Sequence, residues 1–215
     1  MAATRFLTDK ALKAGDRMIP LIKASHNNYT GVPAAAYALN SDLKGGVIVM
    51  TNQQIGNNVT PDRQGVILAR AYLAAFQAGI QRIFWYEFQA GEHDLFYNED
   101  HFGIVHNDLS PKPAYMAMKA MTRARPAGSM MAAGSWRTGA ICHSIWKRPD
   151  GRNAWALWMP EGETNCSLTV RGRIEEAFDH LGNKVDLAVA GESVTATLGE
   201  SILYIIGPAD IKLPL

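Results

Sequence analysis

The sequence has almost no excess charge of either sign. Its 215 residues include 21 Lys and Arg against 20 Asp and Glu, so the net charge is +1. A field this weak does not attract nucleic acid or an anionic membrane, and the basic residues form no stripe with interleaved aromatics. We therefore expect no nucleic-acid partner and no membrane partner.

Motifs for metals and cofactors are also missing. The two cysteines, Cys142 and Cys166, lie in different predicted strands. A disulfide between them is possible, but buried free thiols are the expected state. No CxxC pair or His/Cys cluster has zinc-site spacing. The acidic run at residues 92–100 lacks the ligand spacing of a calcium site and is expected to be a solvated loop. GxSxG, P-loop and GxGxxG motifs do not occur, and the sequence predicts no cofactor.

Long apolar runs are absent as well. The stretch Met1–Leu7 has no apolar core long enough for a signal peptide, and no later segment is long enough to cross a bilayer. As written, the chain is expected to be cytoplasmic, whereas a longer parent protein could be secreted. Hydrophobic residues still make up 47% of the sequence, enough for one large packed domain or two small ones.

The pattern up to residue 127 alternates between strand and helix signals. Thr60 and Pro61 mark a helix start, as N-cap and first helical residue, and Gly79 follows that helix. Ser110 and Pro111 mark another. Strand, loop and helix recur three times, which is typical of a parallel α/β architecture. Strands are predicted at 18–24, 47–50 and 79–88, and helices at 32–43, at 60–78 and from Ser110 to before Pro126.

Polar or aromatic side chains lie at the ends of these three strands, where parallel strands would bring them to one face. The two amides can only hydrogen-bond at neutral pH, and the tryptophan offers a flat apolar platform for a sugar ring. A core role for the tryptophan and a structural role for the histidine are the alternatives. The candidates are His26, Tyr29, Asn52, Gln53, Trp85 and Glu87.

After residue 127 the pattern changes to short alternating runs separated by turn signals. Arg148-Pro149-Asp150-Gly151 predicts a hairpin between the first two runs. We therefore expect an α/β domain at 1–127 and a small antiparallel β-sandwich at 128–215. The predicted strands are 140–147, 153–159, 167–170, 176–178, 193–198 and 202–206.

Several segments resemble the C-terminal part of clan A glycoside hydrolases of the cellulase and family 39 type. The resemblance implies an α/β plus all-β fold, made of the last three βα units of a TIM-type (β/α)8 barrel and an appended β-sandwich. It implies hydrolysis of O-glycosidic bonds in oligo- or polysaccharides, with His26, Tyr29, Gln53 and Trp85 binding the sugar. The similar segments are Ser25–Tyr29, Val47–Gly56, Arg82–Glu87, Phe102–Ile104 with Asp108–Tyr115, which is the most specific, and Phe178–Asn183.

The sequence departs from this family at the catalytic positions. The family nucleophile is a glutamate after the threonine of the seventh strand, but here Thr51 is followed by Asn52. The acid/base glutamate follows the fourth strand, which the chain does not include, and Glu87 is the remaining substitute. A retaining mechanism requires two carboxyl groups about 5–5.5 Å apart. We therefore expect this chain to be inactive alone.

Part of a barrel has open edges, since only closure removes them. One interpretation is a fragment of a longer hydrolase. Another is a non-catalytic carbohydrate-binding protein in which Asn52 is an adaptation. In a third, the chain is a subunit that completes its barrel with a separate N-terminal half, or self-associates through its open sheet edges.

Overall fold

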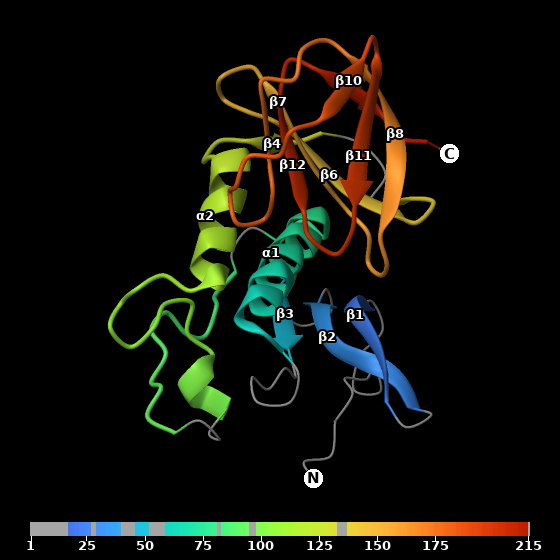
Figure 1. Cartoon of the computed structure of the whole chain (residues 1–215). Coiled ribbons are helices and arrows are strands. Elements are labelled where there is room, and N and C mark those ends of the chain that lie inside the picture. Colours follow the sequence, from blue (N-terminus) through green and yellow to red (C-terminus); the bar gives the residue numbers. More distant parts are fainter. Residues whose placement is uncertain are drawn as a thin grey trace. The chain divides into compact units, whose positions relative to one another are not determined.

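The computed structural model describes residues 17–26, 29–39, 46–51, 59–80, 83–94, 98–132 and 137–214. Helices and antiparallel sheets are both present, and the chain divides into two compact units, 1–112 and 113–215 (Figure 1). The predicted domain boundary at 127/128 stays a prediction. Among these residues, no helix is both long enough and apolar enough to cross a membrane.

The first unit begins with an antiparallel sheet of strand order β1-β2-β3, built from β1 (Arg17–His26), β2 (Tyr29–Leu39) and β3 (Gly46–Thr51). The strands predicted at 18–24 and 47–50 are confirmed. The helix predicted at 32–43 is wrong for residues 32–39, which belong to β2, and the parallel order is wrong because β2 pairs antiparallel with both neighbours.

Pairing on both sides explains why β2 is not helical. Two neighbouring strands satisfy its backbone N–H and C=O groups. This pairing overrides the helix preference of its alanines, because intrinsic propensity is small compared with tertiary interactions. Pro33, which has no N–H to donate, falls at a register shift where the pairing steps from Ala34 to Gly31. A proline is tolerated in a sheet at such an irregularity.

Helix α1 (Pro61–Gln77) follows as predicted. The hydroxyl of Thr60 accepts a hydrogen bond from Arg63 N at 3.2 Å, and Gly79 follows the helix with a φ of 80°. The helix is buried continuously from Gln64 to Ala71, as expected of a helix that is covered on several sides. It packs against β1, β2 and β3.

The buried strand predicted at 79–88 is wrong. Residues 83–88 form no strand, and alternate side chains point to solvent: Phe84 is 91% exposed, Tyr86 66% and Phe88 58%. The chain first pairs at Gln89, in a single parallel bridge to Val105. A buried strand needs neighbouring strands for its backbone groups, and the described residues provide none beside this stretch.

Helix α2 (Pro113–Ala124) begins the second unit, after the short 3₁₀ helix Asn98–His101 in the first. It starts later than the predicted Ser110-Pro111 pair. Ser110 instead donates its hydroxyl and its backbone N–H to Asp108 Oδ1, at 2.5 and 2.9 Å, and Pro111 forms a bridge with Val105. These two residues close a turn and leave the helix start to Pro113.

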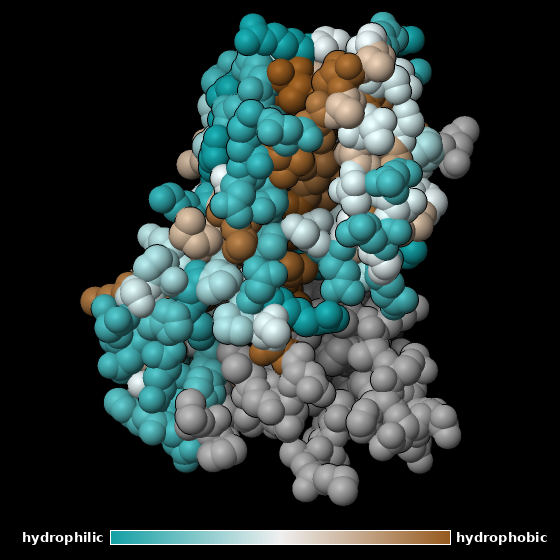
Figure 2. Space-filling model, in the orientation of Figure 1, coloured by the Kyte–Doolittle hydropathy of each residue, from teal (hydrophilic) through white to brown (hydrophobic). Residues whose placement is uncertain are grey.

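The rest of the second unit contains two antiparallel sheets with one shared hydrophobic core. Trp155 and Ile205 enter it from one sheet, and Leu168 and Val194 from the other. Figure 2 shows a strip of hydrophobic residues on the visible face of this unit, bordered by hydrophilic ones. One sheet has the order β4-β6-β7-β12-β9, with β5 on β6, and the other β10-β11-β8-β13. The strands are β4 (Met130–Met131), β5 (Arg137–Thr138), β6 (Ile141–Lys147), β7 (Asn153–Trp158), β8 (Thr164–Arg171), β9 (Glu176–Phe178), β10 (Ala188–Ala190), β11 (Ser193–Leu198), β12 (Leu203–Gly207) and β13 (Asp210–Lys212).

Sequence patterning locates the longer strands of these sheets and the short β9, and it misses four other short strands, β4, β5, β10 and β13. Both cysteines are buried and free, as predicted, and burial raises the pKa of the Cys166 thiol.

The predicted hairpin at 148–151 is present and holds the end of α2. Arg148 N donates to Arg152 O at 2.9 Å, which closes the turn. The Arg148 guanidinium donates to the carbonyls of Arg123 and Ala124, at 2.6 and 2.8 Å, and its other face binds Asp150. A cation on the last carbonyls of a helix satisfies acceptors that the helix itself leaves open.

We expect Arg148→Ala to destabilise the second unit by about 2 kcal/mol, since hydrogen bonds to a charged group contribute roughly 1.5–3 kcal/mol. The control is Arg171→Ala. The native Arg171 guanidinium lies 4.0 Å from the Glu192 carboxylate, and both side chains are mostly exposed. An exposed pair contributes about 0–1 kcal/mol. Urea unfolding followed by far-UV circular dichroism measures both variants, and equal effects would contradict the capping role of Arg148.

Candidate functional site

The structure describes four of the six predicted site residues. His26 ends β1, Tyr29 begins β2, and the two are register partners across that hairpin end. Trp85 and Glu87 lie on the segment that leads into the loop of residues 89–112. Asn52 and Gln53 lie outside the described residues, so their predicted roles stay predictions.

Trp85 is anchored through its indole N–H. Its Nε1 donates to the carbonyl of Phe102 at 3.1 Å, and the residue is half-buried. Gln64 from α1 donates to the carbonyls of His101 and Phe102, at 3.2 and 3.3 Å, and Lys112 Nζ donates to that of His101 at 2.9 Å. Donors from three parts of the first unit thus converge on two consecutive carbonyls and fix the orientation of the indole.

Lys112 is an ammonium group in an unusual place, with only 3% of the residue exposed. Burial lowers the pKa of its amine, while the negative charges of Glu92 and Glu87 raise it in part. A buried charge needs such partners because desolvation opposes its ionised form. Lys112 therefore holds the loop through the carbonyl of His101, while the charges of the two carboxylates favour its ionised form.

A second group of hydrogen bonds holds the loop around Glu92. Its carboxylate lies 2.7 Å from His106 Nδ1 and accepts from Asn107 N at 3.1 Å. The Asn107 side chain donates to Gly91 O at 2.9 Å, and Gln89 donates to Asn107 O at 2.6 Å. The loop ends at residues 89–92 and 106–107 are thereby joined.

Partial burial raises the pKa of Glu92, but the hydrogen bonds from Asn107 and His106 and the charges of His106 and Lys112 outweigh it. The pKa of this carboxyl group is therefore below its ordinary range.

Two acidic residues of this loop, Glu92 and Asp100, already accept hydrogen bonds that hold the loop together. Asp100 Oδ2 accepts from the backbone N–H groups of His93 and Asp94, at 3.0 and 2.6 Å, and Glu92 is held as described. The expectation of a simply solvated loop is therefore wrong for Glu92 and Asp100. In contrast, the Glu87 side chain accepts no hydrogen bond from the described residues. The Glu87 carboxylate therefore has acceptor capacity left within the described part of the chain.

Sequence reasoning missed Lys112 and His106 as parts of this site. The partners Glu92 and His106 are 14 residues apart, and Gln64 and His101 are 37 apart. No motif spacing covers such separations. The local signal that did point to this site was a tryptophan in an apolar run, and that residue is Trp85, which the structure anchors through its indole N–H.

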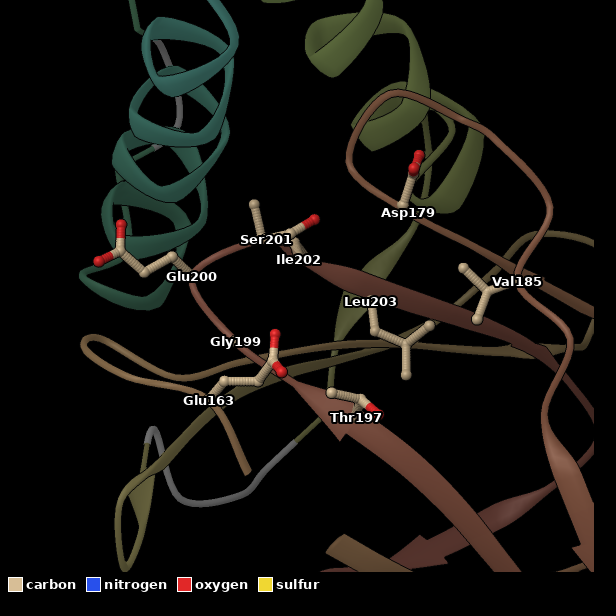
Figure 3. A pocket seen from close by; sticks show the side chains of 9 residues that line it. All are labelled: Glu163, Asp179, Val185, Thr197, Gly199, Glu200, Ser201, Ile202 and Leu203. Atoms are coloured by element: carbon tan, nitrogen blue, oxygen red, sulfur yellow. The ribbon is translucent and has the colours of Figure 1, made fainter. Parts of the chain in front are cut away.

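The second unit contains a separate small cavity of about 170 Å³. In Figure 3, Val185 and Leu203 form the apolar part of its wall, and Glu200 points away from them. The Asp179 carboxylate already takes part in a turn, since its Oδ1 accepts hydrogen bonds from Leu181 N and Asn183 N at 2.9 Å each. Ligand pockets usually measure about 300–1,000 Å³, so this cavity is small for an oligosaccharide. Within the described ranges, no group of three or more His, Cys, Asp or Glu could hold a metal ion.

No protein-family model matches the chain, and no curated protein matches it either. Among solved structures, it is similar to a family 39 glycoside hydrolase from the gut symbiont Bacteroides cellulosilyticus WH2, with a TM-score of 0.60, 20% identity, and coverage of 72% of this chain and 32% of that one. It is also similar to the catalytic domain of GH30 xylanase C from Talaromyces cellulolyticus, with a TM-score of 0.50, 13% identity, and coverage of 70% and 36%.

The chain therefore spans about a third of the length of both glycoside hydrolase structures. At these identities the likeness shows a shared fold. The chain has the fold of part of a glycoside hydrolase, which agrees with the resemblance found in the sequence at that coarser level.

Gly103 gives a test of the loop structure. A Cβ at this position would overlap the backbone of Ala90, where Ala90 N donates to Val105 O at 3.0 Å. We expect Gly103→Ala to cost at least about 2 kcal/mol, as overpacking against fixed atoms does. Hydrogen exchange at Ala90 measures the loss of protection.

Gly199→Ala is the matched control, because its Cβ would meet nothing closer than 3.6 Å. Unchanged protection of Ala90 in Gly103→Ala would contradict the packing described here.

The lowered pKa of Glu92 gives a pH prediction. Because the unfolded chain binds the proton at a higher pH than the folded one, the stabilisation is complete above the ordinary glutamate pKa and is lost as the pH falls through the folded value. The Asn107 amide resonance, titrated from about pH 6 to pH 2, should move with this pKa. Glu92→Gln should remove the transition, and an ordinary glutamate midpoint in the native protein would refute the assignment.

Proposed function

We propose that the chain is the C-terminal part of a glycoside hydrolase-like protein that acts on O-glycosidic bonds of oligo- or polysaccharides. The observation that supports this most is the likeness to the family 39 enzyme over 72% of the chain. In this proposal the segment from α1 to α2 corresponds to the last part of a TIM-type (β/α)8 barrel, and residues 128–215 form an appended β-sandwich. The antiparallel sheet β1-β2-β3 is not parallel barrel structure, so the fold assignment does not rest on it, and the roles proposed below for residues at its strand ends rest on the sequence resemblance alone.

Trp85 is the residue we assign to sugar binding first. Its indole N–H is held by Phe102 O, so the ring is fixed before a ligand arrives and little side-chain entropy is lost on binding. A fixed aromatic face provides apolar contact area for the C–H face of a sugar ring. His26, Tyr29 and Gln53 are proposed to add hydrogen bonds.

The chain alone is proposed to be inactive. Asn52 stands where the resemblance places the nucleophile, and an amide forms no glycosyl-enzyme intermediate. Glu92 and Asp100 are engaged in holding the loop, so they are poorly suited to supply a catalytic pair. Glu87 remains as one carboxylate, and a retaining mechanism needs two.

The test uses the purified chain with xylo-oligosaccharides and aryl glycosides. We expect no turnover, and saturable binding by titration calorimetry that weakens at least about tenfold in Trp85→Ala, which corresponds to a loss of about 1.4 kcal/mol. The control is Tyr115→Ala, an aromatic 37% exposed on α2. Turnover that Glu87→Gln abolishes would overturn the proposed inactivity, and no binding to any of these sugars would overturn the role of Trp85.

A second candidate function is a non-catalytic carbohydrate-binding protein. It is favoured by the same engagement of Glu92 and Asp100, which serves structure and leaves binding to the anchored aromatic. Binding without turnover in the isolated chain agrees with both candidates. Turnover gained on supplying a separate N-terminal barrel half would favour a hydrolase subunit over a binding module.

A further inference from the structure

Gln64 is a buried amide that uses only one of its two polar ends. The residue is 6% exposed, and its Nε2 donates to the carbonyls of His101 and Phe102 at 3.2 and 3.3 Å. Its Oε1 is buried and accepts no hydrogen bond within the described part of the chain. The two carbonyls fix this orientation, because turning the amide over would set Oε1 against two oxygens that can only accept. Half of the polar group is therefore buried without a partner.

Stability alone does not favour an amide at this position. Burying an unpaired acceptor costs at least as much free energy as an ordinary hydrogen bond contributes. A methionine has nearly the size and shape of a glutamine and would fill the space without that cost. Both carbonyls would also keep a donor without Gln64. Lys112 donates to the carbonyl of His101, and Trp85 donates to that of Phe102. We therefore expect the amide to add little to the stability of the fold.

Gln64 does add a link between a rigid helix and the acceptor of Trp85. It lies in the first turn of α1, where its backbone N–H donates to Thr60 O at 3.0 Å and the Thr60 hydroxyl caps the same turn. Its Nε2 and the indole Nε1 of Trp85 share one acceptor, the carbonyl of Phe102. An acceptor that is also held from the helix leaves the indole less freedom than the single bond to Trp85 would, because a supporting contact fixes the geometry of the first one.

We infer that Gln64 is a positioning residue for Trp85, which fixes the direction of the indole through the carbonyl of Phe102 and does not touch a ligand itself. The consequence for sugar binding rests on the function proposed above, whereas the orientation of the indole does not. An indole that is free to move must lose that freedom when a ligand binds, and this loss lowers the affinity. Removing the amide should therefore weaken binding without a matching loss of stability.

The experiment compares the full chain with Gln64→Met. The indole N–H resonances report the orientation directly, and that of Trp85 is identified by its loss in Trp85→Phe. In Gln64→Met we expect this resonance to move upfield and its proton to exchange with water at least about tenfold faster. The urea midpoint, followed by circular dichroism, should stay within about 0.5 M of the native one. Binding of xylo-oligosaccharides should weaken roughly fivefold, as expected when one ordered side chain is released.

Gln77→Met makes the same replacement at the last residue of α1, and as the control it should leave the Trp85 resonance unchanged. An unchanged Trp85 resonance in Gln64→Met would overturn the inference. A urea midpoint that falls beyond the stated limit, or a variant that does not fold, would overturn it too, because Gln64 would then serve stability. Unchanged sugar affinity beside an altered resonance would refute the role in binding. If the native chain binds none of these sugars, the proposed function fails, and the resonance still decides whether Gln64 positions the indole.

Discussion

The described part of the first unit depends on two consecutive carbonyl groups, those of His101 and Phe102. Gln64 reaches them from a buried helix, Lys112 from the end of the loop, and Trp85 from the segment that precedes the loop. Each donor alone is an ordinary hydrogen bond, whose net contribution is about 1 kcal/mol. Their effect comes from convergence, because the three parts of the chain cannot move separately while they share these acceptors. The same bonds that hold the loop also fix the aromatic ring to which we assign sugar binding.

What the sequence could predict is what local chemistry decides. The limits of α1 follow from Thr60, Pro61 and Gly79, which act within a turn of the helix ends. The hairpin at 148–151 follows from its turn residues in the same way. The helix expected at 32–43 failed because β2 is stabilised by two neighbouring strands, and strand pairing is not visible in one alanine-rich segment.

The candidate site shows the same division. Trp85 was found because a tryptophan offers a flat apolar face to a sugar ring, a property that the residue has without reference to distant partners. Lys112 and His106 were missed because their roles come from partners distant in the sequence, a backbone carbonyl for the one and Glu92 for the other. The stretch 83–88 was expected to be buried because its residues are apolar. Apolar composition predicts that a surface will be covered, but it does not say by what, and here the cover is not within the described chain.

Structure and catalysis compete for the same acidic residues in this loop. A carboxylate that accepts hydrogen bonds from neighbouring backbone groups has a lowered pKa and is a poor general acid near neutral pH, as is the case for Glu92. The Asp100 carboxylate accepts hydrogen bonds from two backbone N–H groups, which engages it in holding the loop. Using these residues in catalysis would require releasing the loop that positions Trp85, so binding would weaken as acid–base capacity was gained. In the role we propose, a chain that keeps this loop intact holds a sugar and leaves Glu92 and Asp100 to the structure.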